Sequence, residues 1–220
     1  MSDAPTLSLE VPLDIDNNES AYNMSDRVHI CRTSSQSNRL DLHEAPKNYG
    51  VVVPHIFRSS CPTDANLSFL AANDLSMLLP LTPEIMSPVP SAIRLPAARE
   101  LYCLPSTKYC QPDKKLYSVV IASVKFILQH QEPLLLHCNS GRHRTGVVIG
   151  CLRRVMGWSM SATLAEYRMF AGRKTRLHDM HLIELFDPAS IDVASLNLHP
   201  WFQTYFDVLK ELTPISGVFK

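Results

Sequence analysis

The sequence predicts an α/β fold, a single domain with a central sheet flanked by helices. Three stretches indicate this fold. Residues 116–128 repeat apolar side chains at helix spacing, residues 134–138 form a short apolar run, and residues 145–156 are apolar again after a glycine loop. Helix, strand and helix in succession build sheets that are covered by helices.

The chain divides into three parts by composition. Its 220 residues are 45% hydrophobic and 19% charged, as in ordinary soluble domains. Residues 1–46 carry 3 Lys and Arg against 8 Asp and Glu, and we expect a disordered acidic tail there. Residues 47–195 form the expected domain. Residues 196–220 form an amphipathic helix and tail, with Trp201, Phe202, Tyr205, Phe206 and Leu209 on one face. We expect this helix to dock on the domain, and a partner groove is the alternative.

Several classes of protein are excluded by what the sequence lacks. The N-terminus has no secretory signal, and no run approaches the roughly 18 apolar residues of a membrane span. We expect a cytoplasmic protein, with the nucleus as the alternative compartment, that binds neither membrane nor nucleic acid. The six cysteines include no Cys-x-x-Cys pair, which favours free thiols and argues against a metal site. No cofactor is expected.

The remaining elements follow from turn signals along the chain. We expect a hairpin around Pro54, a short helix within residues 62–74 capped by Thr63 or Asp64, and a strand near residues 75–79. Seven prolines between residues 80 and 112 predict loop, with one strand at 100–104. Gly146 and Gly150 share a helix face that we expect to pack on the sheet. Further helices are expected at residues 161–172, 177–186 and 201–212.

The loop "HCNSGRHRTG" carries the clearest chemistry. Cys138 and Arg144 stand six residues apart between the expected strand and a helix beginning near Thr145. Such a turn points backbone N–H groups inward and forms a nest for an anion, to which the helix N-terminus adds its dipole. Arg144 can grip two phosphate oxygens, and the same field favours a thiolate nucleophile at Cys138. Thr145 can donate its hydroxyl to the sulfur, and Gly141 lets the backbone approach the anion.

Basic residues are concentrated around and after this loop. Between residues 137 and 176 one acid, Glu166, stands against eight basic residues: Arg142, Arg144, Arg153, Arg154, Arg168, Arg173, Lys174 and Arg176. A solvated helix face is one interpretation of this excess, and a site for a highly anionic ligand is the other.

The loop resembles the signature of cysteine-dependent phosphatases, and most closely that of the plant-and-fungal atypical dual-specificity phosphatases. Further stretches agree with this family: "NYGVVVPHIFRSSCPTDANLSFL", "GCLRRVMGW", "EYRMFAGRKTR" and "IELFD". The resemblance implies a compact α/β phosphatase fold without a metal. Some members remove the β-phosphate of inositol pyrophosphates, and others are described as acting on phosphotyrosine.

The resemblance also implies roles for individual residues. Cys138 would be the phosphocysteine nucleophile and Arg144 the phosphate clamp. His137 would orient the loop and favour the thiolate, unless it is simply a packed histidine at a strand end. The other loop positions would bind phosphate or substrate: Asn139, Ser140, Gly141, Arg142, His143 and Thr145. Some relatives have a basic residue in place of Ser140, and its loss would weaken the grip on a very highly charged ligand.

For two assignments outside the loop, a functional and a plain structural interpretation have equal weight. Lys174 and Arg176 match a basic pair that would form a second anion contact, or they are a solvated helix end. Asp113 would be the general acid that protonates the leaving oxygen, or it is an ordinary helix N-cap. Residues 80–111 depart from the family pattern, so its substrate contacts cannot be assigned there.

The sequence therefore predicts a phosphatase acting on an anionic phosphorylated substrate, first of all an inositol pyrophosphate. The alternatives are a protein tyrosine or dual-specificity phosphatase and a weakly active phosphate-binding scaffold. The acid upstream of the loop excludes low-molecular-weight tyrosine phosphatases, and the Arg-Thr-Gly ending argues against rhodaneses.

Overall fold

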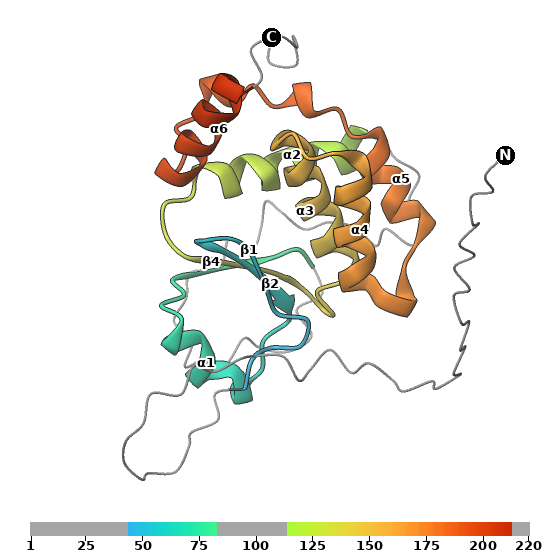
Figure 1. The fold of residues 1–220 in the computed structure, drawn as a ribbon. Coiled ribbons are helices and arrows are strands. Elements are labelled where there is room, and N and C mark those ends of the chain that lie inside the picture. The colour runs from blue at the N-terminus through green and yellow to red at the C-terminus, as the bar shows by residue number, and fades with distance from the viewer. Residues whose placement is uncertain (1–43, 83–113, 213–220) are drawn as a thin grey trace, which may run out of the picture. The chain divides into compact units, whose positions relative to one another are not determined.

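A four-stranded sheet organises the domain in the computed structural model, which describes residues 44–82 and 114–212 (Figure 1). β1 (Gly50–Val53) and β2 (Ile56–Ser60) form the expected antiparallel hairpin around Pro54. β3 (Met77–Pro80) and β4 (Leu134–Cys138) complete the strand order β1-β2-β4-β3, in which β2 and β3 run parallel to β4. The carboxyl ends of three strands therefore meet at one edge.

Helices cover both faces of the sheet. α2 (Lys114–Gln129), α3 (His143–Val155), α4 (Met160–Ala171), α5 (Leu177–Leu185) and α6 (Pro200–Leu212) lie above it in Figure 1, and α1 (Leu67–Ala72) lies below. Side chains alternate between the faces along β4. Leu134 and Leu136 join the large core under the helices, whereas Leu135 packs with Leu70 of α1. This arrangement confirms the predicted fold class.

Short 3-10 turns connect several of these elements. They are η2 (Asp64–Asn66), η3 (Gly172–Lys174), η4 (Pro188–Ser190) and η5 (Val193–Ser195). Thr63 is the N-cap of η2, and its backbone N–H donates to Oδ1 of Asn66 at 2.9 Å. The expected cap and short helix are therefore present, although the helix opens with a 3-10 turn.

The C-terminal helix docks on the domain, as expected. Phe202 and Phe206 are buried in the large core, and Trp201, Tyr205 and Leu209 pack against it. The Tyr205 hydroxyl donates to the backbone carbonyl of Met156 at 2.8 Å. An aromatic face of this size removes enough apolar surface from water to hold the helix in place.

α3 begins at His143, close to the expected start near Thr145, so Arg144 lies in its first turn. One expectation about this helix was wrong. Gly146 and Gly150 do not face the sheet. A Cβ at Gly146 would lie 2.8 Å from the Tyr167 ring, and one at Gly150 would lie 2.6 Å from Ile183 Cδ1. These glycines instead let α4 and α5 pack closely on α3.

Three expectations lie outside the described residues: most of the acidic tail at 1–46, the strand at 100–104, and Asp113. The division at residues 46 and 195 stays a prediction. No helix in the ranges 44–82 and 114–212 has the length and apolarity needed to cross a bilayer.

Candidate active site

The catalytic loop lies where β4 passes into α3. Cys138 ends the strand, and its register partner is Ser60 at the end of β2. α3 begins at His143. Cys138 is 4% exposed and Arg144 is half-buried. The order of strand, tight loop and helix agrees with the prediction. It places Cys138 at the start of the loop and the N-terminal turn of α3 at the end of the loop.

Gly141 is fixed by its backbone and by its neighbours. Its φ is +66°, in the left-handed region that favours glycine. A Cβ there would lie 2.4 Å from the carbonyl carbon and oxygen of Ser59, and this backbone cannot move aside as a flexible side chain could. The loop can therefore close against β2 only with glycine at this position.

Two residues that the sequence analysis did not single out hold the outside of the loop. Nη2 of Arg58 donates to the Gly141 carbonyl at 2.9 Å, and Nδ2 of Asn48 donates to the same oxygen at 3.0 Å. Because a trans peptide points its C=O and N–H in opposite directions, the N–H of Arg142 then faces the inside of the loop. An arginine inside the apolar strand "IFRSS" was the signal that could have identified Arg58.

Thr145 and His137 are both fully buried beside the loop. The hydroxyl of Thr145 has no hydrogen-bond partner within the part of the chain that the structure describes, so it is available to a sulfur or phosphate oxygen. Strand alternation places His137 on the opposite sheet face from Cys138. That position agrees with a packed strand-end histidine, and its orienting role stays a prediction.

The second basic segment lies against the catalytic loop. Nε2 of His143 lies 2.8 Å from the backbone carbonyl of Lys174, which joins α3 to the turn after α4. Burial lowers the pKa of His143. The Lys174 carbonyl and Asp179 oppose this shift, and Arg176 and Arg142 add to it. The structure thus brings the expected pair, Lys174 and Arg176, to the side of the loop.

A buried pair anchors this second segment. The Tyr167 hydroxyl donates to Oδ2 of Asp179 at 2.7 Å and accepts from the Arg176 backbone N–H at 3.3 Å. Burial and the bond to Asp179 raise the pKa of Tyr167, so it stays a hydrogen-bond donor. Tyr167 also packs on Gly146, which links the segment to the first turns of α3.

The basic excess after the loop is of mixed origin. Arg153 belongs to neither interpretation made from the sequence, because it is buried, with Nε 2.7 Å from Oε2 of Glu166 and Nη2 2.9 Å from the Val52 carbonyl. Its guanidinium also lies 4.1 Å above the Trp158 ring. Arg142, Arg144, Lys174 and Arg176 are basic residues of this excess that belong to the loop, to the first turn of α3 or to the segment beside them.

The chain leaves β3 at the same edge of the sheet. Leu81 and Thr82, the last described residues before 83–113, are buried, and the Leu81 N–H donates to the His137 carbonyl at 2.8 Å. Asp113 itself is outside the described ranges, directly before α2.

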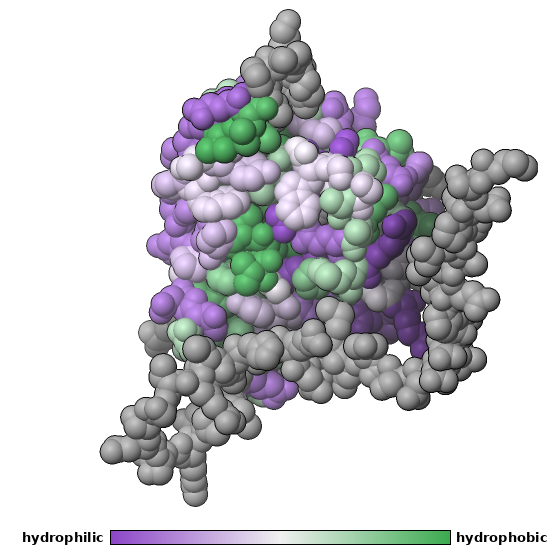
Figure 2. Space-filling model, viewed as in Figure 1, coloured by the Kyte–Doolittle hydropathy of each residue, from purple (hydrophilic) through white to green (hydrophobic). Residues whose placement is uncertain are grey.

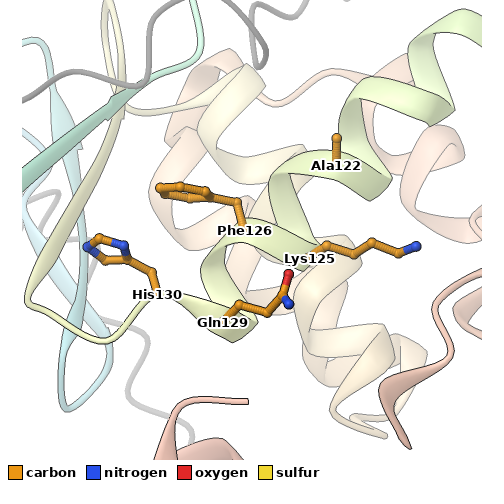
Figure 3. A pocket seen from close by; sticks show the side chains of 5 residues that line it. All are labelled: Ala122, Lys125, Phe126, Gln129 and His130. Carbon is orange, nitrogen blue, oxygen red and sulfur yellow. The ribbon is translucent and has the colours of Figure 1, made fainter. Parts of the chain in front are cut away.

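Two hollows lie away from this edge. One, of about 390 Å³, is lined by Ala122, Lys125, Phe126, Gln129 and His130 on the half of α2 that leads into the start of β4 (Figure 3). The other, of about 630 Å³, follows α6 between Pro200 and Leu212, where Figure 2 shows apolar surface. Within residues 44–82 and 114–212, no group of three His, Cys, Asp or Glu could hold a metal ion.

Comparison with known proteins matches this geometry. The family model described as "Tyrosine phosphatase family" matches residues 45–204. "Probable tyrosine-protein phosphatase DG1060" of Dictyostelium discoideum is 36% identical over 66% of this chain and 89% of its own length. "Inositol diphosphatase DSP3" of Arabidopsis thaliana is 32% identical over 75% of this chain and 82% of its own.

A solved structure agrees with the fold as well. The core catalytic domain of the PP-IP phosphatase SIW14 from S. cerevisiae, crystallised with citrate, aligns with a TM-score of 0.58 at 32% identity. The alignment covers 66% of this chain and 88% of that domain.

Proposed function

We propose that this chain, which belongs to the tyrosine phosphatase family, hydrolyses inositol pyrophosphates through a phosphocysteine on Cys138. The observation that carries the proposal is the loop itself. Cys138 ends a buried strand, Arg144 lies in the next helical turn, and Gly141 closes the loop between them. Family membership makes the chain a phosphatase, and the substrate and the residue roles are the proposal.

The reaction has two steps. Sγ of Cys138 attacks phosphorus while Arg144 and the loop N–H groups hold the phosphoryl oxygens, and the bond to the leaving oxygen breaks. Asp113 donates a proton to that oxygen. Water then attacks the phosphocysteine, its proton returns to Asp113, and the sulfur leaves as a thiolate that accepts a hydrogen bond from Thr145. Inorganic phosphate is released, and the enzyme returns to its starting state.

Charge around the loop supports a polyphosphate substrate. Lys174 and Arg176 flank the loop through the contact between His143 and the Lys174 carbonyl, and Arg142 is part of the loop. An inositol pyrophosphate carries further phosphates around the one that is cleaved, and these need cations beyond Arg144. The Arabidopsis relative is named an inositol diphosphatase, which agrees with this assignment. Ser140, in place of a basic residue, weakens the same field.

A parallel phosphate-release assay tests the proposal. Purified protein is given a diphosphoinositol polyphosphate and a phosphotyrosine peptide, with Cys138→Ser as the blank. We expect phosphate from the inositol substrate only with intact Cys138. Release from the peptide alone would replace this function with the tyrosine phosphatase activity that the Dictyostelium relative's name describes. Tight binding without release from either substrate would indicate a scaffold.

The cytoplasmic location expected from the sequence is part of this proposal. Microscopy of the tagged full-length chain tests it, and accumulation of the protein in the nucleus would select the alternative compartment.

A further inference from the structure

Arg58 is a charged residue in the middle of the sheet. It belongs to β2, pairs in register with Leu136 of the central strand, and is 1% exposed. Its guanidinium lies 3.6 Å from the centre of the Phe170 ring, and Nη2 donates to the Gly141 carbonyl at 2.9 Å. The cation therefore lies directly behind the catalytic loop.

The free-energy cost of burying this cation is only partly compensated by hydrogen bonds. Nε and Nη1 of Arg58 are buried and have no hydrogen-bond partner among the described residues. The nearby carboxylate of Glu166 is bonded by Arg153 instead. Burying a guanidinium without a bonded carboxylate is costly, so a role in this position has to offset the cost.

The groups that face Arg58 determine its charge. Burial lowers the pKa of Arg58 to about 10, and Arg153 of α3 lowers it further, whereas Glu166 of α4 and Cys138 of β4 raise it. Arg58 thus remains charged near neutral pH, and its bond to the Gly141 carbonyl is a charge-assisted hydrogen bond.

We propose that Arg58 is a positioning residue for the catalytic loop, holding the Gly141 carbonyl outward through a buried, charged donor. This turns the Arg142 N–H toward the bound phosphate. This inference rests on the proposed function, since it gives Arg58 a part in the same site.

The chain offers a matched control in Arg153. Both arginines are buried and both lie on an aromatic ring, but Arg153 bonds Glu166 and Val52 rather than the loop. Arg58→Met and Arg153→Met each remove a buried cation of similar shape. Each is expected to lower the melting temperature, and only the first should weaken phosphate binding by the loop.

The experiment measures how well inorganic phosphate protects Cys138 from alkylation by iodoacetamide, followed on its own peptide by mass spectrometry. In Arg58→Met, protection should need roughly tenfold more phosphate, the cost of one hydrogen bond of about 1.4 kcal/mol. Arg153→Met should keep the wild-type protection.

Arg58→Lys keeps the test decisive if Arg58→Met does not fold. Lysine retains the charge but not the planar fork, so phosphate protection should weaken in this variant too. Unchanged protection in Arg58→Lys, or in folded Arg58→Met, would overturn the proposal. Alkylation needs no substrate, so an inactive enzyme with the predicted loss of protection would refute the proposed function and not this inference.

Discussion

Gly141 shows how one residue sets the shape of the catalytic loop. Two other glycines, Gly157 and Gly172, also have positive φ, but a Cβ at Gly157 would meet only Leu209 Cδ2 at an ordinary contact distance of 3.4 Å. A Cβ at Gly172 would meet nothing within 4 Å, whereas one at Gly141 would overlap the Ser59 backbone. The strain of a positive φ and the clash with β2 can therefore be separated experimentally.

Gly141→Ala should abolish measurable phosphatase activity and destabilise the domain by more than Gly172→Ala. Backbone strain alone costs about 1–3 kcal/mol, and both variants carry it. The additional loss in Gly141→Ala comes from displacing the loop from β2. Urea unfolding gives the two free energies of unfolding, and equal values would mean that the loop accommodates a side chain.

Removal of the Thr145 hydroxyl should lower activity without lowering stability. Its buried hydroxyl has no partner among the described residues, so folding gains nothing from it. Thr145→Val should leave the free energy of unfolding unchanged or higher. It should slow turnover by roughly 10- to 100-fold, because a hydrogen bond to the leaving thiolate contributes about 1.5–3 kcal/mol.

Rapid-quench kinetics with Thr145→Val should show a burst of leaving group followed by slow phosphate release, since breakdown of the phosphocysteine becomes rate-limiting. Thr145→Ser keeps the hydroxyl and should behave as the wild type. Slow turnover without a burst would assign Thr145 to the first step instead.

At the scale of elements, periodicity predicted most of what the structure shows. The helix at α2 and the docking face of α6 follow from apolar spacing, because each buries one face in the core, and β4 follows from a continuous apolar run, because both of its faces are buried. The apolar spacing did not predict which elements pack against each other. Gly146 and Gly150 indicated close packing, but their contacts with Tyr167 and Ile183 depend on how α4 and α5 return across α3.

Three histidines gather where α6 joins the sheet. His55, in the turn between β1 and β2, stacks on His199 at 3.6 Å between ring centroids, and both face His130 at the end of α2. Trp201 and Phe202 pack on His55 from α6. Burial lowers the pKa of His55 to about 4, and His199 and His130 lower it further, so the folded state keeps this ring neutral.

Acidification should therefore loosen α6. Above pH 6.5 His55 is neutral in both the folded and the unfolded chain, so burying it on folding releases no proton. As the pH falls from about 6.5 to 4, the unfolded chain takes up a proton that folded His55 resists, so the free energy of unfolding falls by up to roughly 3 kcal/mol.

Urea unfolding across this pH range measures the effect. His55→Phe should flatten the dependence, because it removes the buried titrating ring and keeps an aromatic side chain against His199. His178→Gln is the control, since His178 is exposed on α5. Equal pH dependence in His55→Phe and the wild type would show that other groups cause the loss.

At the scale of the whole molecule, the site depends on segments far apart in sequence. The loop motif identified Cys138 and Arg144, because their spacing is local. Arg58 and Asn48 reach the loop only through the strand order β2-β4, which no local pattern reveals. Charge counting also placed Arg153 in the basic excess, although folding buries it against Glu166.

The charge distribution predicts how the enzyme should discriminate between substrates. The chain has no net charge, yet Arg142, Lys174 and Arg176 gather at the catalytic edge. Lys174→Gln with Arg176→Gln should raise KM for a diphosphoinositol polyphosphate about tenfold or more, and more at low salt than at high salt, because its outer phosphates lose two cations.

The same double variant should leave KM for a phosphotyrosine peptide nearly unchanged, since Cys138 and Arg144 still bind its single phosphate. Arg168→Gln, on the exposed face of α4, removes a charge away from the loop contact and serves as the control. An equal rise in KM for both substrates would mean that Lys174 and Arg176 shape the loop itself. No rise for either would mean that the two side chains are only a solvated helix end. Selective loss for the inositol substrate would show that the segment after α4 reads the charge of the substrate, while the loop performs the chemistry.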